Sequence, residues 1–475
     1  MTIKKGSVVE VEIDSAAFEG KGVGRLNGMA VFVPGTAPGD RVLARVVKKK
    51  KKYCEAKLEE VLSPSPERIE PRCCHADVCG GCNWQHIPYE AQLRIKEQQV
   101  RDHVERLGGL NPEVVESILG SDTPFYYRNK MEYSFGNRRW LSREEIERDE
   151  YVDDQAFAAG LHAPGRFDKI LNLKECHLQN PVSYRLLDEV RNWCIQHDIP
   201  AYDTKKHVGF MRHLVVRNAH YTDDLMVNLV TSDEDPERIG PLAVHLLRQF
   251  PEITTLVNNV NDQPNPTAVG QTEHVLHGNG YIVDHLGDYQ FKISANAFFQ
   301  TNTRQAEKLY STALDFAGLN RNHILYDLYC GVGTLSLFMS RYVRKVVGIE
   351  LVDVAVENAR ENARQNEVDN VHFVKGDMKD TFHEQLLQAE GDPDCIITDP
   401  PRAGMHPDVV KRLNELSVSH LIYVSCNPST LARDLKELSD AYHVERVKPV
   451  DMFPQTYHIE AIASLSAKSS RQPGE

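Results

Sequence analysis

Four of the ten cysteines lie close together in the sequence, at Cys73, Cys74, Cys79 and Cys82, and the other six are scattered. Ten cysteines in 475 residues are too few for a disulfide scaffold. In a reducing compartment, such a group is typical of metal or cluster ligands. The spacing leaves both zinc and an iron–sulfur cluster open, because thiolates bind either.

A glycine-rich turn follows the apolar run 324–326. The segment from Asp327 to Thr334 reads DLYCGVGT and precedes a helical pattern. Two glycines allow the backbone to pass close to a ligand at the carboxyl end of a strand. Ser336 stands where a dinucleotide-binding turn has its third glycine, and Glu350 could accept hydrogen bonds from two ribose hydroxyls. The pattern favours a nucleoside ligand, with S-adenosylmethionine ahead of a dinucleotide; the alternative is a tight turn made for packing.

Two further apolar runs end in residues that could do chemistry. Asp399 opens the sequence Asp-Pro-Pro-Arg, which resembles a motif of amino-group methyltransferases. Those enzymes have an aromatic residue where Arg402 stands, which argues against transfer to an exocyclic amine. Cys426 follows the apolar run 421–424 and would face the same crevice, a suitable place for a nucleophile. The alternative is that Cys426 is a small buried hydrophobe, which is the commoner role of a scattered cysteine.

The elements that must position these side chains alternate in type from about residue 296. Apolar runs are separated by helical patterns, which is typical of a parallel sheet with helices on both faces. Open sheets of this kind bind ligands at the carboxyl ends of their strands, where the turn, Asp399 and Cys426 would lie. Residues 296–475 are therefore predicted to form an α/β domain that carries the site.

The first 62 residues differ from the rest in pattern and charge. Short alternating strands with Gly/Pro turns predict a small β-barrel. This segment has 12 Lys and Arg against 8 Asp and Glu, although the whole chain has a net charge of −13. The consecutive lysines from Lys48 to Lys52 are either a solvated hairpin tip or a patch that tracks the phosphates of a nucleic acid.

Residues 71–295 mix helical and strand-like patterns. A helix is predicted near 89–107, and the stretches 213–217 and 225–230 are expected to pair as a hairpin. No apolar run approaches the roughly 18 residues of a membrane span. The charged N-terminus also lacks the apolar core of a signal peptide. With 41% hydrophobic and 26% charged residues, the chain is expected to be a cytoplasmic globular protein of about three domains.

Together these motifs resemble the RNA uracil-C5 methyltransferases that use S-adenosylmethionine, specifically the bacterial ribosomal-RNA branch with a TRAM domain and an iron–sulfur cluster. The matching segments, which span nearly the whole chain, are the cysteine group, RNKMEYSF (128–135), SANAFFQTN (294–302), DLYCGVGT (327–334), DPPRAG (399–404), YVSCNPSTLARD (423–434) and MFPQTYHIEAI (452–462). The resemblance implies a Rossmann-like α/β methyltransferase domain at 296–475. It also implies a TRAM/OB-like RNA-binding β-barrel at 1–62 and a central α+β iron–sulfur domain at 71–295, whose helix near 89–107 could pack on the catalytic domain.

The resemblance also implies a mechanism. Uracil C5 is a poor nucleophile, so Cys426 adds to C6 and generates an enolate whose C5 attacks the methyl group. Glu460 matches the base that removes the C5 proton before the cysteine is eliminated. Phe298 and Phe299 could help to hold the flipped base. The implied cofactor contacts are Gln300, Tyr329, Thr334, Glu350, Asp377 and Asp399.

The resemblance decides between zinc and a cluster. Cys73, Cys79 and Cys82 reproduce the family's spacing, Cys176 is the implied fourth ligand, and Cys74 has no counterpart. These four cysteines are therefore expected to hold a [4Fe–4S] cluster. Because the reaction has no redox step, the expected role of the cluster is to fold the central domain and shape the RNA site.

The expected substrate is a uridine of 23S ribosomal RNA. Bacterial transfer-RNA relatives typically lack both the TRAM segment and the cluster, but this separates the targets by family analogy only. The alternatives are a transfer-RNA uracil methyltransferase and a non-catalytic RNA-binding or ribosome-assembly protein that would not need Cys426 and Glu460. A monomer without a membrane partner is expected, and residues 201–284 have no functional interpretation.

Overall fold

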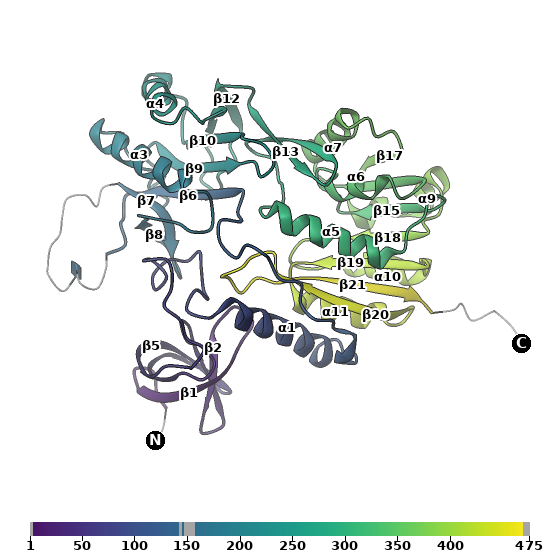
Figure 1. Ribbon diagram of the computed structural model, residues 1–475, viewed down its shortest axis with the longest axis horizontal. Coiled ribbons are helices and arrows are strands. Elements are labelled where there is room, and N and C mark those ends of the chain that lie inside the picture. Colours follow the sequence, from purple (N-terminus) through teal and green to yellow (C-terminus); the bar gives the residue numbers. More distant parts are fainter. Residues whose placement is uncertain (1–2, 142–144, 147–156, 469–475) are drawn as a thin grey trace, which may run out of the picture.

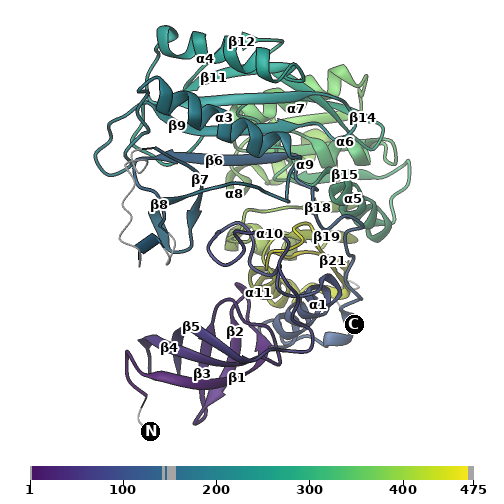
Figure 2. The ribbon, with the colours of Figure 1, turned by 60° about the vertical axis from the view of Figure 1, so that its left-hand side comes forward.

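The computed structural model describes residues 3–141, 145–146 and 157–468, which form three bodies (Figure 1). An N-terminal barrel and a central sheet lie on one side of the molecule, and a C-terminal α/β domain lies on the other. Figure 2 shows the barrel set apart from the central sheet, with elements of the C-terminal domain between them. Among the described residues, no helix is both long and apolar enough to cross a membrane.

The predicted N-terminal barrel is confirmed. Its five strands close in the order β1-β2-β3-β5-β4. Alternate residues such as Val11, Ile13 and Val42 point inward and are almost fully buried, as the period-two pattern requires. The lysine run lies at the exposed turn between β4 and β5. The strands are β1 (Val8–Ala16), β2 (Gly22–Leu26), β3 (Met29–Val33), β4 (Arg41–Lys49) and β5 (Tyr53–Ser63).

A helix, α1 (Tyr89–Arg106), connects the cysteine-rich segment to the rest of the chain. It forms where the helical pattern predicts it, and it packs on the C-terminal domain. Val100 and Val104 are buried in the same apolar cluster as residues of that domain's sheet. The chain then makes a short 3₁₀ turn, η1 (Pro112–Val114), before it enters the central sheet.

The central domain is a seven-stranded sheet in the order β12-β11-β10-β9-β6-β7-β8. Strands β9 and β10 pair antiparallel, so the predicted hairpin is confirmed. Helices α3 (Val182–Gln196) and α4 (Pro236–Gln249) bury their apolar faces in one cluster against the sheet. The strands are β6 (Lys130–Gly136), β7 (Ala158–Ala163), β8 (Arg166–Asn172), β9 (Met211–Asn218), β10 (Leu225–Thr231), β11 (Thr255–Val260) and β12 (Thr272–His277).

A two-stranded hairpin, β13 (Tyr281–Leu286) and β14 (Tyr289–Ser294), leads into the C-terminal domain. Its buried residues Ile282, Leu286 and Phe291 belong to the apolar cluster that covers one face of the C-terminal sheet. The hairpin therefore packs with the core of the C-terminal domain, although it lies within the region that the sequence interpretation treats as central.

The C-terminal sheet has the strand order β17-β16-β15-β18-β19-β21-β20. The first five strands are parallel, as predicted, whereas β21 runs antiparallel to both of its neighbours. A short connection between β20 and β21 can join only antiparallel strands, which explains this departure from an all-parallel sheet. The strands are β15 (Ile324–Leu328), β16 (Lys345–Glu350), β17 (Val371–Lys375), β18 (Cys395–Thr398), β19 (His420–Ser425), β20 (Tyr442–Val450) and β21 (Glu460–Ala467).

Helices cover both faces of this sheet, and the two faces form separate apolar clusters. One face is covered by α5 (Thr303–Ala317), α6 (Thr334–Ser340) and α7 (Asp353–Gln365). The other face is covered by α1, α8 (Met378–Thr381), α9 (Glu384–Glu390), α10 (Pro407–Leu416) and α11 (Pro428–Leu438). Because the five strands β15 to β19 are parallel, the residues that follow them lie along one edge of the sheet.

Candidate active site

The glycine-rich turn lies at the carboxyl end of β15 and begins α6. Tyr329 adopts a left-handed conformation with φ +67°, and Gly331 and Gly333 have φ +56° and +80°. A Cβ atom at Gly333 would lie 2.7 Å from the Phe373 ring. Glycine is therefore required at Gly333 by both conformation and space. A left-handed tyrosine is the kind of strain that concentrates at functional sites.

Four of the six predicted cofactor contacts line a cavity beside this turn. Its lining includes Gln300, Tyr329, Thr334 and Asp399. The Thr334 hydroxyl is 2.9 Å from that of the buried Tyr310, which also lines the cavity. Phe299 is buried in the lining, whereas Phe298 is largely exposed at its mouth, with 69% of its surface accessible.

The other two predicted contacts follow the neighbouring strands. Glu350 ends β16 and accepts hydrogen bonds from the backbone N–H groups of Gly331 (3.0 Å) and Val352 (2.9 Å). Asp377 caps α8 just after β17 by accepting a bond from the Lys379 N–H (3.2 Å). Burial raises the pKa of Tyr329 to about 12, and the nearby Asp377 carboxylate contributes. Glu350 and Asp377 thus flank the turn from two adjacent strand ends.

Two carboxyl groups in the cavity lining, those of the buried Asp327 and the half-buried Asp399, have raised pKa values. Burial raises the pKa of Asp399 to about 7. Burial likewise raises the pKa of Asp327 to about 7, against a hydrogen bond from the Ser336 hydroxyl (2.5 Å). The second carboxyl oxygen of Asp327 is buried without a hydrogen-bond partner. A cationic ligand in the cavity would stabilise both carboxylates and lower both pKa values.

Sequence reasoning did not single out Asp327 or Tyr310 as site residues. The signal for Asp327 was an acidic residue inside an otherwise apolar strand, four positions before Gly331. Tyr310 gives no comparable signal, because it lies on the apolar face of α5 and reads as a core residue.

Cys426 and Glu460 come together from two adjacent antiparallel strands. Ser425, the last residue of β19, pairs with Ala461 of β21. Continuing this register by one residue places Cys426 beside Glu460, which begins β21. Both side chains are half-buried, and Asp399 interacts electrostatically with each of them.

The electrostatics of this group favour protonated forms. Burial raises the pKa of Cys426 to about 11, with further increases from Glu460 and Asp399 and an opposing effect of Arg402. Burial, and then Asp399, raises the pKa of Glu460 well above its ordinary value. The arrangement places a sulfur nucleophile and a carboxyl group side by side at the edge of the sheet that carries the cavity, where they could act on the two ends of one double bond.

The structure also gathers Cys73, Cys79, Cys82 and Cys176. Burial raises the pKa of Cys82 to about 12, and the charges of the other three contribute to this shift. Backbone N–H groups donate to the sulfurs of Cys73 and Cys79 at 3.4 Å. Within the described ranges, no group of three or more His, Cys, Asp or Glu side chains is arranged to hold a metal ion.

Cys74, which has no predicted role, is exposed. Its backbone N–H donates to Glu175 at 2.8 Å. Cys74 is thus more exposed than the four predicted ligands, of which Cys176 is buried and Cys73, Cys79 and Cys82 are half-buried.

Known proteins are similar to this chain over nearly its whole length. The family model for tRNA (Uracil-5-)-methyltransferase matches residues 271–468, and that for the TRAM domain matches residues 3–58. An uncharacterized RNA methyltransferase of Chlorobaculum tepidum is 43% identical over 97% of this chain and 96% of the relative. One of Porphyromonas gingivalis is 42% identical over 96% of this chain and 99% of the relative.

A solved structure also matches nearly the whole chain. It is the tRNA (uracil-54, C5)-methyltransferase of Pyrococcus abyssi in complex with S-adenosyl-L-homocysteine, with 28% identity and a TM-score of 0.74. The match covers 96% of this chain and 100% of that chain. With the full-length relatives and the family models, it shows that this chain belongs to the family of S-adenosylmethionine-dependent RNA uracil-5-methyltransferases.

Proposed function

We propose that this enzyme methylates C5 of a uridine in 23S ribosomal RNA through a covalent Cys426–uracil adduct, with Glu460 as the base, acting as a monomer in the cytoplasm. The observation that carries the chemistry is the position of Cys426 beside Glu460, one strand away from Asp399 and the cofactor cavity. A methyltransferase acting on nitrogen would not need this pair.

The residues around the cavity fit S-adenosylmethionine. When bound, this molecule supplies an electrophilic methyl group on a positively charged sulfonium. Gln300, Tyr329, Thr334 and Asp399 line the cavity that would hold it. Glu350 ends the next strand, where a carboxylate can accept hydrogen bonds from ribose hydroxyls.

In the proposed reaction, the Cys426 thiolate adds to C6 of the uracil, and the electrons of the C5–C6 bond move into the C4 carbonyl as an enolate. C5 of this enolate then takes the methyl group, which forms the C5–carbon bond and leaves S-adenosylhomocysteine. Glu460 accepts the proton from C5, the Cys426–C6 bond breaks, and the C5–C6 double bond returns. Covalent catalysis of this kind divides one difficult substitution into easier steps.

This scheme requires Cys426 and Glu460 to be ionised, although burial raises the pKa values of both groups. With the Cys426 pKa at about 11, only about one thiol in ten thousand is ionised at pH 7. A positive charge in the adjoining cavity favours the ionised form of Cys426, Glu460 and Asp399 alike. Arg402 already acts on Cys426 in this direction. The site is therefore expected to be active only when the cavity is filled.

The proposed cluster would be held by Cys73, Cys79, Cys82 and Cys176. Four thiols partly buried together, with backbone N–H groups directed at two of the sulfurs, are suitable donors for a [4Fe–4S] cluster. Each thiolate of a cluster binds a different iron atom, whereas the ligands of a single ion converge on one point. The proposed role of the cluster is structural, since no step of the reaction changes an oxidation state.

The choice of 23S ribosomal RNA is supported by the combination of a TRAM barrel and the four cysteines, which the bacterial ribosomal-RNA branch is expected to share. The full-length similarity to a transfer-RNA uracil-54 enzyme supports a second candidate, the uridine at the corresponding position of transfer RNA. Both candidates use the same active site, so one experiment can test the chemistry and identify the target.

The test uses 23S ribosomal RNA and transfer RNA transcribed with 5-fluorouridine and incubated with the protein and S-adenosylmethionine. Fluorine cannot leave C5 as a proton does, so the reaction is expected to stop as a protein–RNA adduct that survives a denaturing gel. The adduct should require the cofactor and disappear in Cys426→Ala. Methyl transfer to ordinary RNA without any adduct would overturn the C5 mechanism, and adduct on transfer RNA alone would overturn the ribosomal target.

A further inference from the structure

The connection between β20 and β21 begins and ends beside the proposed base. Val450, the last residue of β20, pairs with Glu460, the first residue of β21. Asp451 therefore starts the connecting loop, residues 451–459, one position from the partner of Glu460. Contacts made by Asp451 therefore act one residue away from the strand partner of Glu460.

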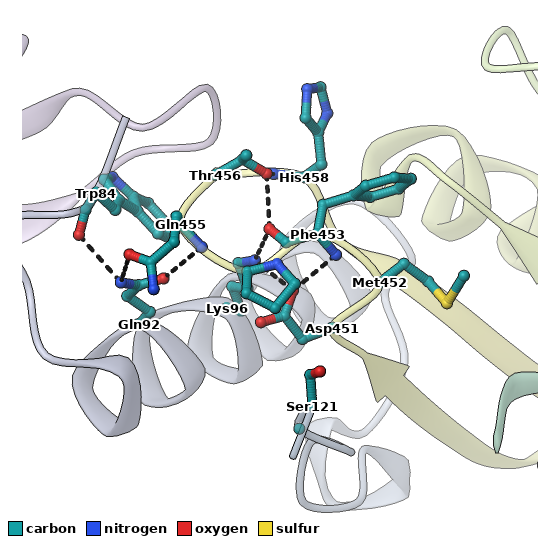
Figure 3. Close-up of polar contacts among 12 residues, drawn as sticks. Trp84, Gln92, Lys96, Ser121, Asp451, Met452, Phe453, Gln455, Thr456 and His458 are labelled. Atoms are coloured by element: carbon teal, nitrogen blue, oxygen red, sulfur yellow. Dashed lines mark hydrogen bonds and ion pairs between the residues drawn. The ribbon is translucent and has the colours of Figure 1, made fainter. Parts of the chain in front are cut away.

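Asp451 is held by a fully buried ion pair with helix α1. The Lys96 ammonium is 2.7 Å from the Asp451 carboxylate, and both side chains have no accessible surface. The Tyr89 hydroxyl donates to the second oxygen of the same carboxylate at 2.9 Å. Lys96 also donates to the backbone carbonyl of Phe453 at 3.2 Å. Figure 3 shows α1 presenting Lys96 to the start of the loop.

A second contact fixes the middle of the loop. The Gln92 amide donates to the Gln455 side chain and accepts from the Gln455 backbone N–H, each at 3.0 Å (Figure 3). The Gln455 carbonyl accepts from the N–H groups of Asn83 and Trp84. Gln455 has φ +68°, a strained conformation that persists only where its surroundings hold it.

Stability alone does not account for this ion pair. Removing two charges from water costs so much that a buried pair is often no more stable than apolar residues of the same size. The best-attested role of such pairs is to select one arrangement among several. Here the pair joins residues that are 355 positions apart in the sequence. Asp451 follows Val450, the strand partner of Glu460.

We infer that the buried Lys96–Asp451 pair, assisted by Tyr89, positions the 451–459 loop so that Glu460 can reach the C5 proton. Lys96, Asp451 and Tyr89 are thus positioning residues of the elimination step, and they act through Glu460. The inference rests on the proposed function, in which Glu460 acts only after the methyl group has been transferred. A loop displaced by about 1 Å can slow a step that needs exact geometry as much as a hundredfold.

The test is a single-turnover reaction with methyl-labelled cofactor. Its substrate is the RNA on which the wild-type chain forms the adduct, now transcribed with ordinary uridine in place of 5-fluorouridine. The variant is Lys96→Met/Asp451→Asn, which removes both charges together and leaves no unpaired buried ion. The labelled methyl group is expected to accumulate in a covalent protein–RNA species. Its formation should stay within about threefold of wild type, while its decay should slow about tenfold or more.

The matched control is Lys345→Met/Glu390→Gln. This pair, 2.6 Å apart, lies at the amino end of β16, at the edge of the sheet opposite the active site. It should leave both rates unchanged. Glu460→Gln is the positive control and should accumulate the same labelled species. If Lys96→Met/Asp451→Asn does not fold, Tyr89→Phe removes only one hydroxyl and should slow the decay by a smaller factor.

The possible failures are distinguishable. No 5-fluorouridine adduct with the wild-type chain would overturn the proposed function. An adduct with wild type and a labelled species in Glu460→Gln, combined with normal decay in folded Lys96→Met/Asp451→Asn and Tyr89→Phe, would overturn only this inference. Equal slowing of formation and decay would show a general structural role instead of positioning of the base, and would also overturn it.

Discussion

In the proposed mechanism Cys426 attacks as a thiolate, yet burial raises its pKa to about 11. Because the pKa is raised, the thiolate fraction is small at neutral pH and grows as the pH rises. Alkylation of Cys426 by iodoacetamide is therefore expected to accelerate about tenfold per pH unit between pH 7 and 10. Mass spectrometry of the peptide that contains Cys426 measures this rate separately from the other cysteines.

A charged ligand in the cavity should change this profile. Sinefungin carries an ammonium group in place of the sulfonium, whereas S-adenosylhomocysteine lacks the charge. At pH 7.5, sinefungin is expected to speed alkylation of Cys426 and S-adenosylhomocysteine is not. A rate independent of pH from 7 to 10 would show that Cys426 is already ionised and would contradict the electrostatic account.

At the scale of single residues, most of the side chains that line the cavity could be predicted from the sequence, but the buried contacts that hold the 451–459 loop could not. Tyr329, Thr334 and Asp399 could be predicted to meet, because they follow strands whose ends share one edge, whereas Gln300 was implied only by the family resemblance. The Lys96–Asp451 pair could not be predicted, because a lysine on a helical pattern normally faces water. Only the tertiary fold brings these two positions together.

At the scale of elements, the turn between β15 and α6 can be tested by a single substitution at Gly333. In Gly333→Ala, the new methyl group would meet Phe373 at 2.7 Å, and the residue would keep φ +80°. Unfolding should become easier by about 1–3 kcal/mol. Because the turn borders the cavity, affinity for S-adenosylhomocysteine should also fall about tenfold, or 1.4 kcal/mol, in calorimetric titration.

Gly318→Ala provides the comparison for this variant. Gly318 ends α5 with φ +55°, and a Cβ atom there would meet nothing within 4 Å. It should lose stability from backbone strain but bind S-adenosylhomocysteine as the wild type does. Equal affinity in both glycine variants would show that the turn does not shape the cofactor site.

The pattern of elements was predictable where periodicity is strong. The helix at α1, the β9–β10 hairpin, the barrel and the five parallel strands all follow from apolar spacing. Strand β20 was not predicted, because exposed charged residues interrupt its alternation and it ends in Pro449-Val450. Its pairing with β21 nevertheless determines where the loop carrying the buried ion pair lies.

At the scale of the whole molecule, the segment that contains the cysteines is hydrogen-bonded to the 451–459 loop. Cys82 directly precedes Asn83 and Trp84, whose N–H groups donate to the Gln455 carbonyl at 2.9 and 3.1 Å. The same segment leads into α1, which holds Asp451 through Lys96. Disorder around the proposed cluster would therefore be transmitted to the loop that returns to Glu460, even though the cluster takes no part in the reaction.

Cys79→Ser tests this connection. The variant is expected to lose the visible absorption of a [4Fe–4S] cluster and most of its soluble yield, because three remaining thiolates hold the cluster poorly. Cys74→Ser, which alters an exposed cysteine, should keep both. In the soluble fraction of Cys79→Ser, decay of the methylated protein–RNA adduct should slow, as in Lys96→Met/Asp451→Asn. A Cys79→Ser protein that folds and methylates RNA at the wild-type rate would show that the cysteine segment neither folds the central domain nor supports the loop.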